Sequence, residues 1–143
     1  MKTRVFETYS FWWSEARLLI AAIALFLGGV PPLYLLVSPS LYTTTTLILK
    51  VSWIISGVAA GHLLYRWYDT GQKLFGHKDH KDTLAFLLLI VTGLNLGFAG
   101  VFGLNLGMNI SRSPIVFFIV AALYLFAAYQ LWTSYQKNKR KIF

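Results

Sequence analysis

The chain alternates between long apolar runs and short polar segments that hold most of its charged residues. A bilayer core of about 30 Å requires roughly 20 helical residues, and each of the four apolar runs is about that long. The pattern therefore predicts a single all-helical domain over residues 1–143 with four transmembrane helices. Their expected bounds are about 17–37, 44–66, 83–108 and 114–134.

The connections between these helices predict two tight antiparallel hairpins. The first and third connections are each about five residues long, which leaves no room for a separate domain. Residues 28–32, with the sequence GGVPP, should bend the first helix near its outer end, because proline lacks a backbone donor and crowds the preceding turn. Asp82 and Ser113 are suitable capping residues for the third and fourth helices.

Residues 1–16 mix charged and aromatic side chains ahead of the first apolar run. Phe6, Tyr9 and Trp13 recur at helical spacing within this segment. We therefore expect residues 1–16 to lie along the inner membrane interface as an amphipathic helix.

The composition is typical of a membrane protein. Hydrophobic residues make up 57% of the chain and charged residues only 13%, whereas a soluble domain has about 25% charged residues. A soluble chain of 143 residues has too little interior to hide this much apolar surface, so lipid must cover the excess. The absence of cysteine excludes disulfides, thiolate metal sites and thiol nucleophiles.

The net charge of +8 comes from basic residues between and outside the apolar runs. The amino-terminal flank, the second connection and the carboxyl-terminal tail are basic, whereas the first connection has no basic residue and the third has only Arg112. The positive-inside rule then predicts that both termini are cytoplasmic, in a plasma or inner membrane. The basic segments should contact anionic lipid headgroups, and no nucleic-acid partner is expected.

The third apolar run contains the segment GLNLGFAGVFGLNLG, residues 93–107. On one continuous helix its glycines would share a face suited to close helix packing: Gly93, Gly97, Gly100, Gly103 and Gly107. Asn95 and Asn105 would point to the opposite side, together with Phe98 and Phe102. The asparagines could link neighbouring helices or line a wet path or pocket, and the glycines could instead break the helix into a re-entrant segment.

Two further polar residues interrupt the second apolar run. Lys50 could reach the outer headgroups by snorkelling, or it could attract an anion in the outer half of the membrane. His62 could be a satisfied histidine at the end of a packed helix, or part of a proton or ion route. It has no second intramembrane histidine with which to hold a haem, so a haem would require a partner chain and no cofactor is predicted.

The second connection, GHKDHKD at residues 76–82, contains potential metal ligands. His77, Asp79 and His80 could bind a cation, but Lys78 and Lys81 oppose one, so a solvated loop is favoured and no metal site is predicted. The sequence also lacks a glycine-rich phosphate loop, an acidic pair within a span, and a serine–histidine–acid set at matching depth. These absences predict a protein that has no catalytic residues and is not an enzyme.

Two functions are compatible with these features. The first is a small homo-oligomeric channel or carrier for ions or small solutes. Its candidate pore or pocket residues are Asn95, Asn105, His62, Lys50, Phe98 and Phe102. The second is an accessory or assembly subunit that packs its glycine face against a larger membrane complex and has no transport or catalytic activity of its own.

Overall fold

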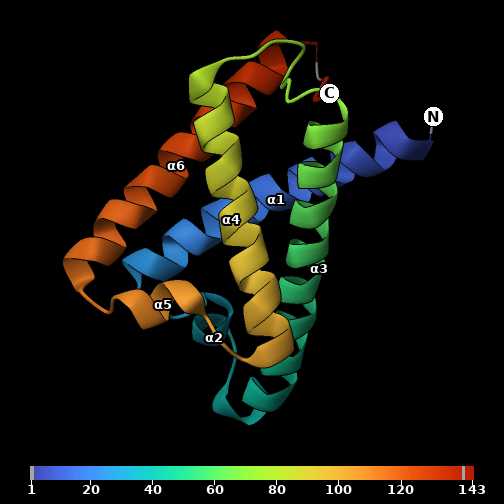
Figure 1. Ribbon diagram of the computed structural model, residues 1–143. Coiled ribbons are helices and arrows are strands. Elements are labelled where there is room, and N and C mark those ends of the chain that lie inside the picture. The colour runs from blue at the N-terminus through green and yellow to red at the C-terminus, as the bar shows by residue number, and fades with distance from the viewer. Residues whose placement is uncertain (1, 140) are drawn as a thin grey trace.

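Two long antiparallel helices, α3 (Tyr42–Asp69) and α4 (His80–Phe102), lie side by side along the length of the molecule (Figure 1). The computed structural model describes residues 2–139 and 141–143. A third long helix, α6 (Pro114–Lys137), packs against α4 at one end of the bundle and diverges from it toward the other (Figure 1). The regular elements of the described residues are therefore helical.

The helix α1 (Lys2–Phe26) crosses behind α3 and α4 at a steep angle (Figure 1). It packs against α6, α3 and α4. The short helices α2 (Leu33–Leu36) and η1 (Pro39–Leu41) join α1 to α3, and α5 (Leu106–Ile110) joins α4 to α6. Because α1 contacts each of the other long helices, its side chains determine much of the interior.

Three helical segments of the described residues are long and apolar enough to cross a membrane, so the prediction of four transmembrane helices is wrong. They are Pro39–Asp69, His80–Phe102 and Pro114–Lys137. The second, third and fourth apolar runs thus correspond to α3, α4 and α6. The first predicted span, 17–37, is divided among the second half of α1, a turn and α2.

The first apolar run is broken at its glycines rather than bent at its prolines. The helix α1 ends at Phe26, and Gly28 and Gly29 follow with φ angles of 76° and 87°. Glycine adopts this left-handed backbone without strain, and the two following prolines have no N–H with which to resume the helix. The segment predicted to lie at the interface, 1–16, is continuous with α1, and its residue 1 lies outside the described residues.

Gly57 of α3 and Gly97 of α4 bring the two helix backbones into contact. A β-carbon on Gly97 would lie 2.8 Å from the Cα of Gly57, which is too close for any side chain. Gly93 and Gly100 also lie against α3. Three of the five glycines on the predicted face are therefore at the contact between α3 and α4.

The other two glycines, Gly103 and Gly107, lie outside α4, so the prediction of one helix over 83–108 is wrong. Gly103 has a φ of 72° and ends the helix, with its N–H donating to the carbonyl of Ala99. Asn105 then caps α5 by accepting a hydrogen bond on its side chain. The left-handed glycine turns the chain away from the helix axis, as it does at many helix ends.

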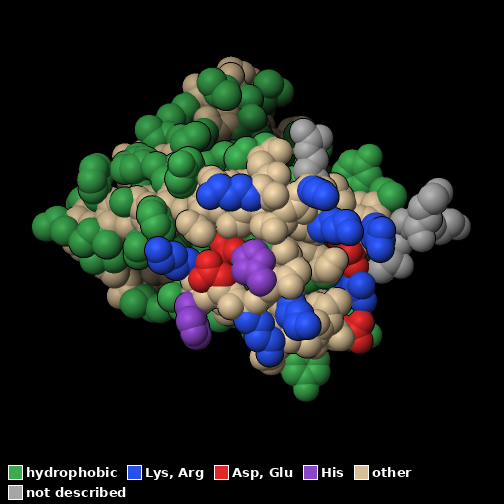
Figure 2. All heavy atoms as spheres, turned by 90° about the horizontal axis from the view of Figure 1, so that it is seen from above, with side chains coloured by type: hydrophobic (Ala, Val, Ile, Leu, Met, Phe, Trp, Pro, Cys, Tyr) green, Lys and Arg blue, Asp and Glu red, His purple; other side chains and the backbone are tan. Residues whose placement is uncertain are grey.

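Basic side chains gather at the end of the bundle that carries the α3–α4 loop and the carboxyl terminus (Figure 2). The exposed lysines of these segments are Lys73, Lys78, Lys81, Lys137, Lys139 and Lys141. The second connection and the tail, which the sequence predicts to be cytoplasmic, thus share one end of the molecule. The cytoplasmic location of this end is a prediction from the positive-inside rule.

Gly97→Ala should destabilise the protein, because the new methyl group must push α3 and α4 apart. Gly61→Ala is the matched control, since a β-carbon there meets nothing within 4 Å. We expect Gly97→Ala to lower the free energy of unfolding by about 1–3 kcal/mol. Gly61→Ala should leave it unchanged or raise it by about 1 kcal/mol or less. Thermal unfolding in detergent measures both variants, and equal effects would contradict the assigned contact.

Candidate functional site

One buried stripe of α1, its polar face, carries charged and hydroxyl side chains and runs beside the buried Phe11 and Leu18. Glu7, Ser10, Ser14 and Arg17 recur at intervals of three and four residues, and all four are buried. The exposed side of the same stretch is mainly aromatic and includes Phe6, Tyr9, Trp12 and Trp13. The polar side chains of this stretch are therefore sequestered, while most of its aromatic side chains are exposed.

Arg17 is the last residue of this polar face and is buried. Its Nη2 donates a 2.8 Å hydrogen bond to the carbonyl oxygen of Leu89, in α4. A β-carbon on Gly93 would lie 3.2 Å from the same nitrogen, so the absence of a side chain there leaves room for the guanidinium group. The other two nitrogens of Arg17, Nε and Nη1, are buried and have no hydrogen-bond partner among the described residues.

Two neighbours of Arg17 are also buried with unused polar atoms. Ser14 Oγ and Glu15 Oε1 have no hydrogen-bond partner among the described residues. The helix α1 is not one of the three candidate spans. Burial raises the pKa of the Glu15 carboxyl from 4.5 to about 8, and the charge of Arg17 lowers it by a smaller amount. Glu15 is therefore mostly uncharged near neutral pH, which leaves a net positive charge at Arg17.

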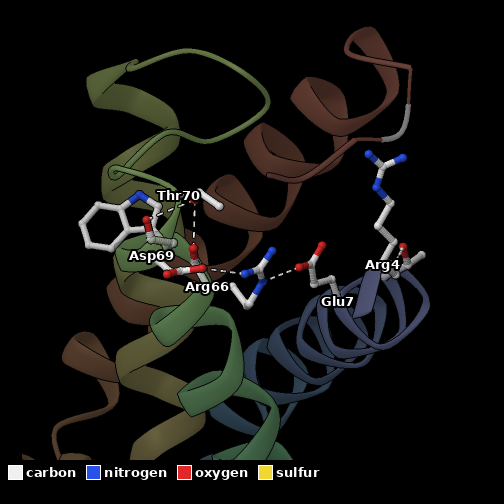
Figure 3. Close-up of polar contacts among 7 residues, drawn as sticks. Arg4, Glu7, Arg66, Asp69 and Thr70 are labelled. Carbon is white, nitrogen blue, oxygen red and sulfur yellow. Dashed lines mark hydrogen bonds and ion pairs between the residues drawn. The ribbon is translucent and has the colours of Figure 1, made fainter. Parts of the chain in front are cut away.

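An ion-pair network holds the amino-terminal part of α1 against the end of α3. Figure 3 shows Glu7 pointing from α1 toward Arg66, with Asp69 on the other side of the guanidinium group. Arg66 Nε donates to Glu7 Oε1, and Arg66 Nη1 donates to Asp69 Oδ2 at 2.7 Å. Thr70 Oγ1 donates to the Arg66 carbonyl at 2.8 Å and closes the end of the helix. This network fixes α1 on the side of the bundle that carries the basic loop.

Two tryptophans attach the middle of α1 to its neighbours. Trp13 Nε1 donates to Ser56 Oγ in α3 at 3.0 Å. Trp12 Nε1 donates to Tyr135 Oη in α6 at 3.3 Å. Both bonds join a mostly apolar ring to a hydroxyl group, so each supplies packing and one polar link.

Asn95 and Asn105 are hydrogen-bonded to each other, a pair called the asparagine clasp below, and do not line one helix face. Asn95 Nδ2 donates to Asn105 Oδ1 at 2.9 Å, and Leu106 N donates to Asn95 Oδ1 at 2.9 Å. Met108 N also donates to Asn105 Oδ1, at 3.2 Å. The expected separation along a continuous helix does not occur, because the chain reverses at Gly103. The two side chains bond to each other and to the backbone of α5, as interhelical amides commonly do.

The remaining candidate pore residues are outside the clasp and occupy three separate places. Phe98 and Phe102 stack with ring centroids 5.4 Å apart on an exposed face of α4. His62 packs edge-on against Phe6 of α1, with ring centroids 4.6 Å apart. Lys50 is exposed and lies about 18 Å from His62 along α3, at 1.5 Å per residue. The six predicted residues therefore do not converge on one site.

The sequence predicts an interfacial segment over residues 1–16 and does not single out Glu15 or Arg17, so the buried cluster emerges only from the structure. A signal was present, since Glu7, Ser10, Ser14 and Arg17 follow the spacing of a helix.

Comparisons with known proteins give this chain no relative: no protein-family model, no curated protein and no solved structure matches it.

The asparagine clasp can be tested with Asn95→Leu. This change removes both hydrogen bonds of Asn95 and should lower the free energy of unfolding by about 0.5–2 kcal/mol. Asn109→Leu is the control, because Asn109 is exposed and its side chain is outside the clasp. Thermal melts in detergent should separate the two variants. A melting temperature for Asn95→Leu equal to that of Asn109→Leu would show that the clasp does not stabilise the fold.

The raised pKa of Glu15 predicts that stability falls as pH rises. Between about pH 4.5 and 8 the folded chain keeps a proton on Glu15 that the unfolded chain has lost. The free energy of unfolding should therefore decrease by about 1.4 kcal/mol or less for each pH unit in this window. Melting temperatures measured from pH 5 to 8 should show this slope, and Glu15→Gln should flatten it.

Asp69→Asn is the control for this pH dependence, since Asp69 is an exposed carboxylate. It should keep the slope of the wild type. A Glu15→Gln variant that retained the full slope would assign the effect to another group.

Proposed function

We propose that the protein is a small, non-catalytic membrane protein that transports ions or small solutes, with the buried polar face of α1 as its binding site. The observation that supports this is Arg17, which is only 6% exposed and makes one hydrogen bond while two of its nitrogens have no partner among the described residues. Charged residues are costly inside a membrane protein, and those that are retained commonly mark a substrate or ion path.

The charge of Arg17 favours an anionic substrate. A guanidinium group is planar and always charged, and its donors suit the oxygen atoms of carboxylates and phosphates. Nε and Nη1 are the donors available for such a ligand, and the hydroxyl of Ser14 adds another. The uncharged form of Glu15 would not repel an anion near neutral pH.

The burial of Arg17 supports a carrier more than an open channel. A ligand would reach the guanidinium group only after α1 moves relative to α3 and α4, so the site would be exposed in one arrangement and closed in another. This is how carriers with a central site operate. In a homo-oligomer each protomer would then be a separate carrier, and no pore would form between the protomers.

An accessory or assembly role is the second candidate, and a different feature supports it. An apolar groove of about 260 Å³ runs along the outer side of α3 and α4. It is lined by Ile54, Gly57, Val58, Leu94, Gly97, Phe98, Val101 and Phe102. Gly57 and Gly97 form the floor of this groove where α3 and α4 touch, and its exposed apolar side chains could pack against a helix from a second copy or from a larger complex.

We also propose that the basic end of the bundle and both chain termini are cytoplasmic, in a plasma or inner membrane. The lysines of the α3–α4 loop and of the tail support this orientation through the positive-inside rule. In that position they would contact anionic lipid headgroups.

The transport proposal is tested by flux in proteoliposomes. Chloride, nitrate, acetate, phosphate, sodium and potassium form a suitable panel of ions. We expect the wild type to move at least one anion, and Arg17→Gln to reduce that flux by about tenfold or more, because the binding charge is lost. Arg17→Lys keeps the charge and should retain part of the flux.

Arg112→Gln is the matched control, since it removes an exposed arginine far along the chain from the site and should leave the flux unchanged. A wild type that moves none of the ions, or a folded Arg17→Gln variant with normal flux, would contradict the proposal. Purification from native membranes with unrelated subunits would then favour the accessory role.

A further inference from the structure

A second cluster of polar residues lies in the turn before α4, at the basic end of the bundle. His77, Asp79 and Asp82 each offer one ligand atom, and these atoms all lie within 4.8 Å of one another. Figure 2 shows acidic and histidine side chains lying together among the lysines and arginines of this end. The cluster is separate from Arg17 and has no role in the proposed transport.

Asp82 is the central residue of this cluster. It is 1% exposed, and its Oδ1 accepts hydrogen bonds from Gln130 Nε2 at 2.8 Å and from Ser134 Oγ at 2.7 Å. Its Oδ2 has no hydrogen-bond partner among the described residues and lies 3.4 Å from His77 Nε2. A buried carboxylate oxygen without a donor is unfavourable unless a cation or another charged group compensates it.

The two donors on Asp82 come from α6 and hold the carboxylate in one orientation. One oxygen is thereby turned toward His77, while the other is fully used. Carboxylates that bind metals are commonly held in this way by hydrogen bonds from surrounding side chains.

A hydrogen bond also orients the side chain of His77, as expected for a metal ligand. Its Nδ1 lies 3.2 Å from the carbonyl oxygen of Phe75, to which it can donate a hydrogen bond. With the proton on Nδ1, the lone pair is on Nε2, and this nitrogen lies 3.4 Å from Asp82 Oδ2. Metal-binding histidines typically donate their second ring N–H to a carbonyl or carboxylate, which fixes the ring and its tautomer.

The backbone around His77 is held in place by further hydrogen bonds. His77 and Leu74 exchange two backbone bonds of 2.9 and 3.0 Å. Phe75 N donates to the carbonyl of Ile142 at 2.7 Å, which ties this turn to the carboxyl-terminal tail. The ligand positions are therefore fixed by α4, α6 and the tail together.

Asp79 supplies the third ligand from the residue that caps α4. Its Oδ1 accepts a hydrogen bond from Lys81 N at 3.0 Å, so the carboxylate is oriented by the first turn of the helix. His80, which the sequence also marked as a possible ligand, is exposed and does not belong to the cluster.

We propose that His77, Asp79 and Asp82 bind a divalent transition-metal ion of the Zn²⁺ type. One imidazole nitrogen and two carboxylate oxygens suit Zn²⁺, which leaves a fourth position for water. In a tetrahedral site with bonds of about 2.1 Å, neighbouring ligand atoms are about 3.4 Å apart. The distance between His77 Nε2 and Asp82 Oδ2 is 3.4 Å.

Lys78 and Lys81 do not prevent this site, although the sequence interpretation counted them against it. Both lysines are exposed, so water and lipid headgroups screen their charges. The bound ion would join the α3–α4 loop to α4, and through Asp82 to α6, so its effect should be structural.

The test uses purified protein without an affinity tag, treated with EDTA and then titrated with ZnCl₂ in detergent. We expect one Zn²⁺ per chain and a higher melting temperature in its presence. Co²⁺ should give the visible absorption of a tetrahedral complex. His77→Gln and Asp82→Asn should each weaken zinc binding by about tenfold or more.

His80→Gln is the matched control, because it removes a neighbouring histidine outside the cluster and should bind zinc like the wild type. His77 is 46% exposed at its side chain, so His77→Gln tests the site even if Asp82→Asn does not fold. Equal zinc binding by His77→Gln and the wild type, or a wild type that binds no zinc, would overturn the proposal. Preferential binding of Mg²⁺ over Zn²⁺ would overturn the assigned type of ion.

Discussion

Gly57 and Gly97 allow α3 and α4 to approach until their backbones touch. Gly93 lies one turn earlier on α4. A side chain at this position would collide with α3 and with the Arg17 guanidinium group. The same small-residue face therefore admits a helix backbone and a charged side chain from α1. A side chain at Gly93 would separate the helices and also displace Arg17 from the Leu89 carbonyl. Lipid gives no hydrophobic force between helices, so such close packing and polar links carry the assembly.

The sequence predicts α3, α4 and α6 well, because hydropathy detects any helix that is apolar over the thickness of a bilayer. The prediction from hydropathy fails for the first apolar run. Hydropathy contains no information on backbone conformation, and Gly28 adopts a left-handed conformation just after the end of α1. The same limit applies to Gly103. On an unbroken helix Asn95 and Asn105 would share one face and lie far apart. The turn at Gly103 instead brings the two side chains into contact.

The candidate sites were predictable in part. The spacing of Glu7, Ser10, Ser14 and Arg17 defines a polar stripe from sequence alone, but the carbonyl that Arg17 meets belongs to a residue 72 positions away. Asp82 was recognised only as a helix cap, because its donors are 48 and 52 positions distant. Local patterns identify which side chains are polar along a helix. The partner of each side chain depends on how the helices cross, which no local pattern contains.

Three of the five acidic residues are buried, namely Glu7, Glu15 and Asp82. Glu7 is paired with Arg66, and Asp82 is held by side chains of α6, so neither carboxylate balances the exposed lysines. The lysines of the α3–α4 loop and of the tail remain exposed and gather at one end of the bundle (Figure 2). Attraction of this end to anionic headgroups needs no specific lipid site. Under the positive-inside rule lysines and arginines set the orientation and acidic residues contribute little, so the burial of three carboxylates leaves the predicted orientation unchanged.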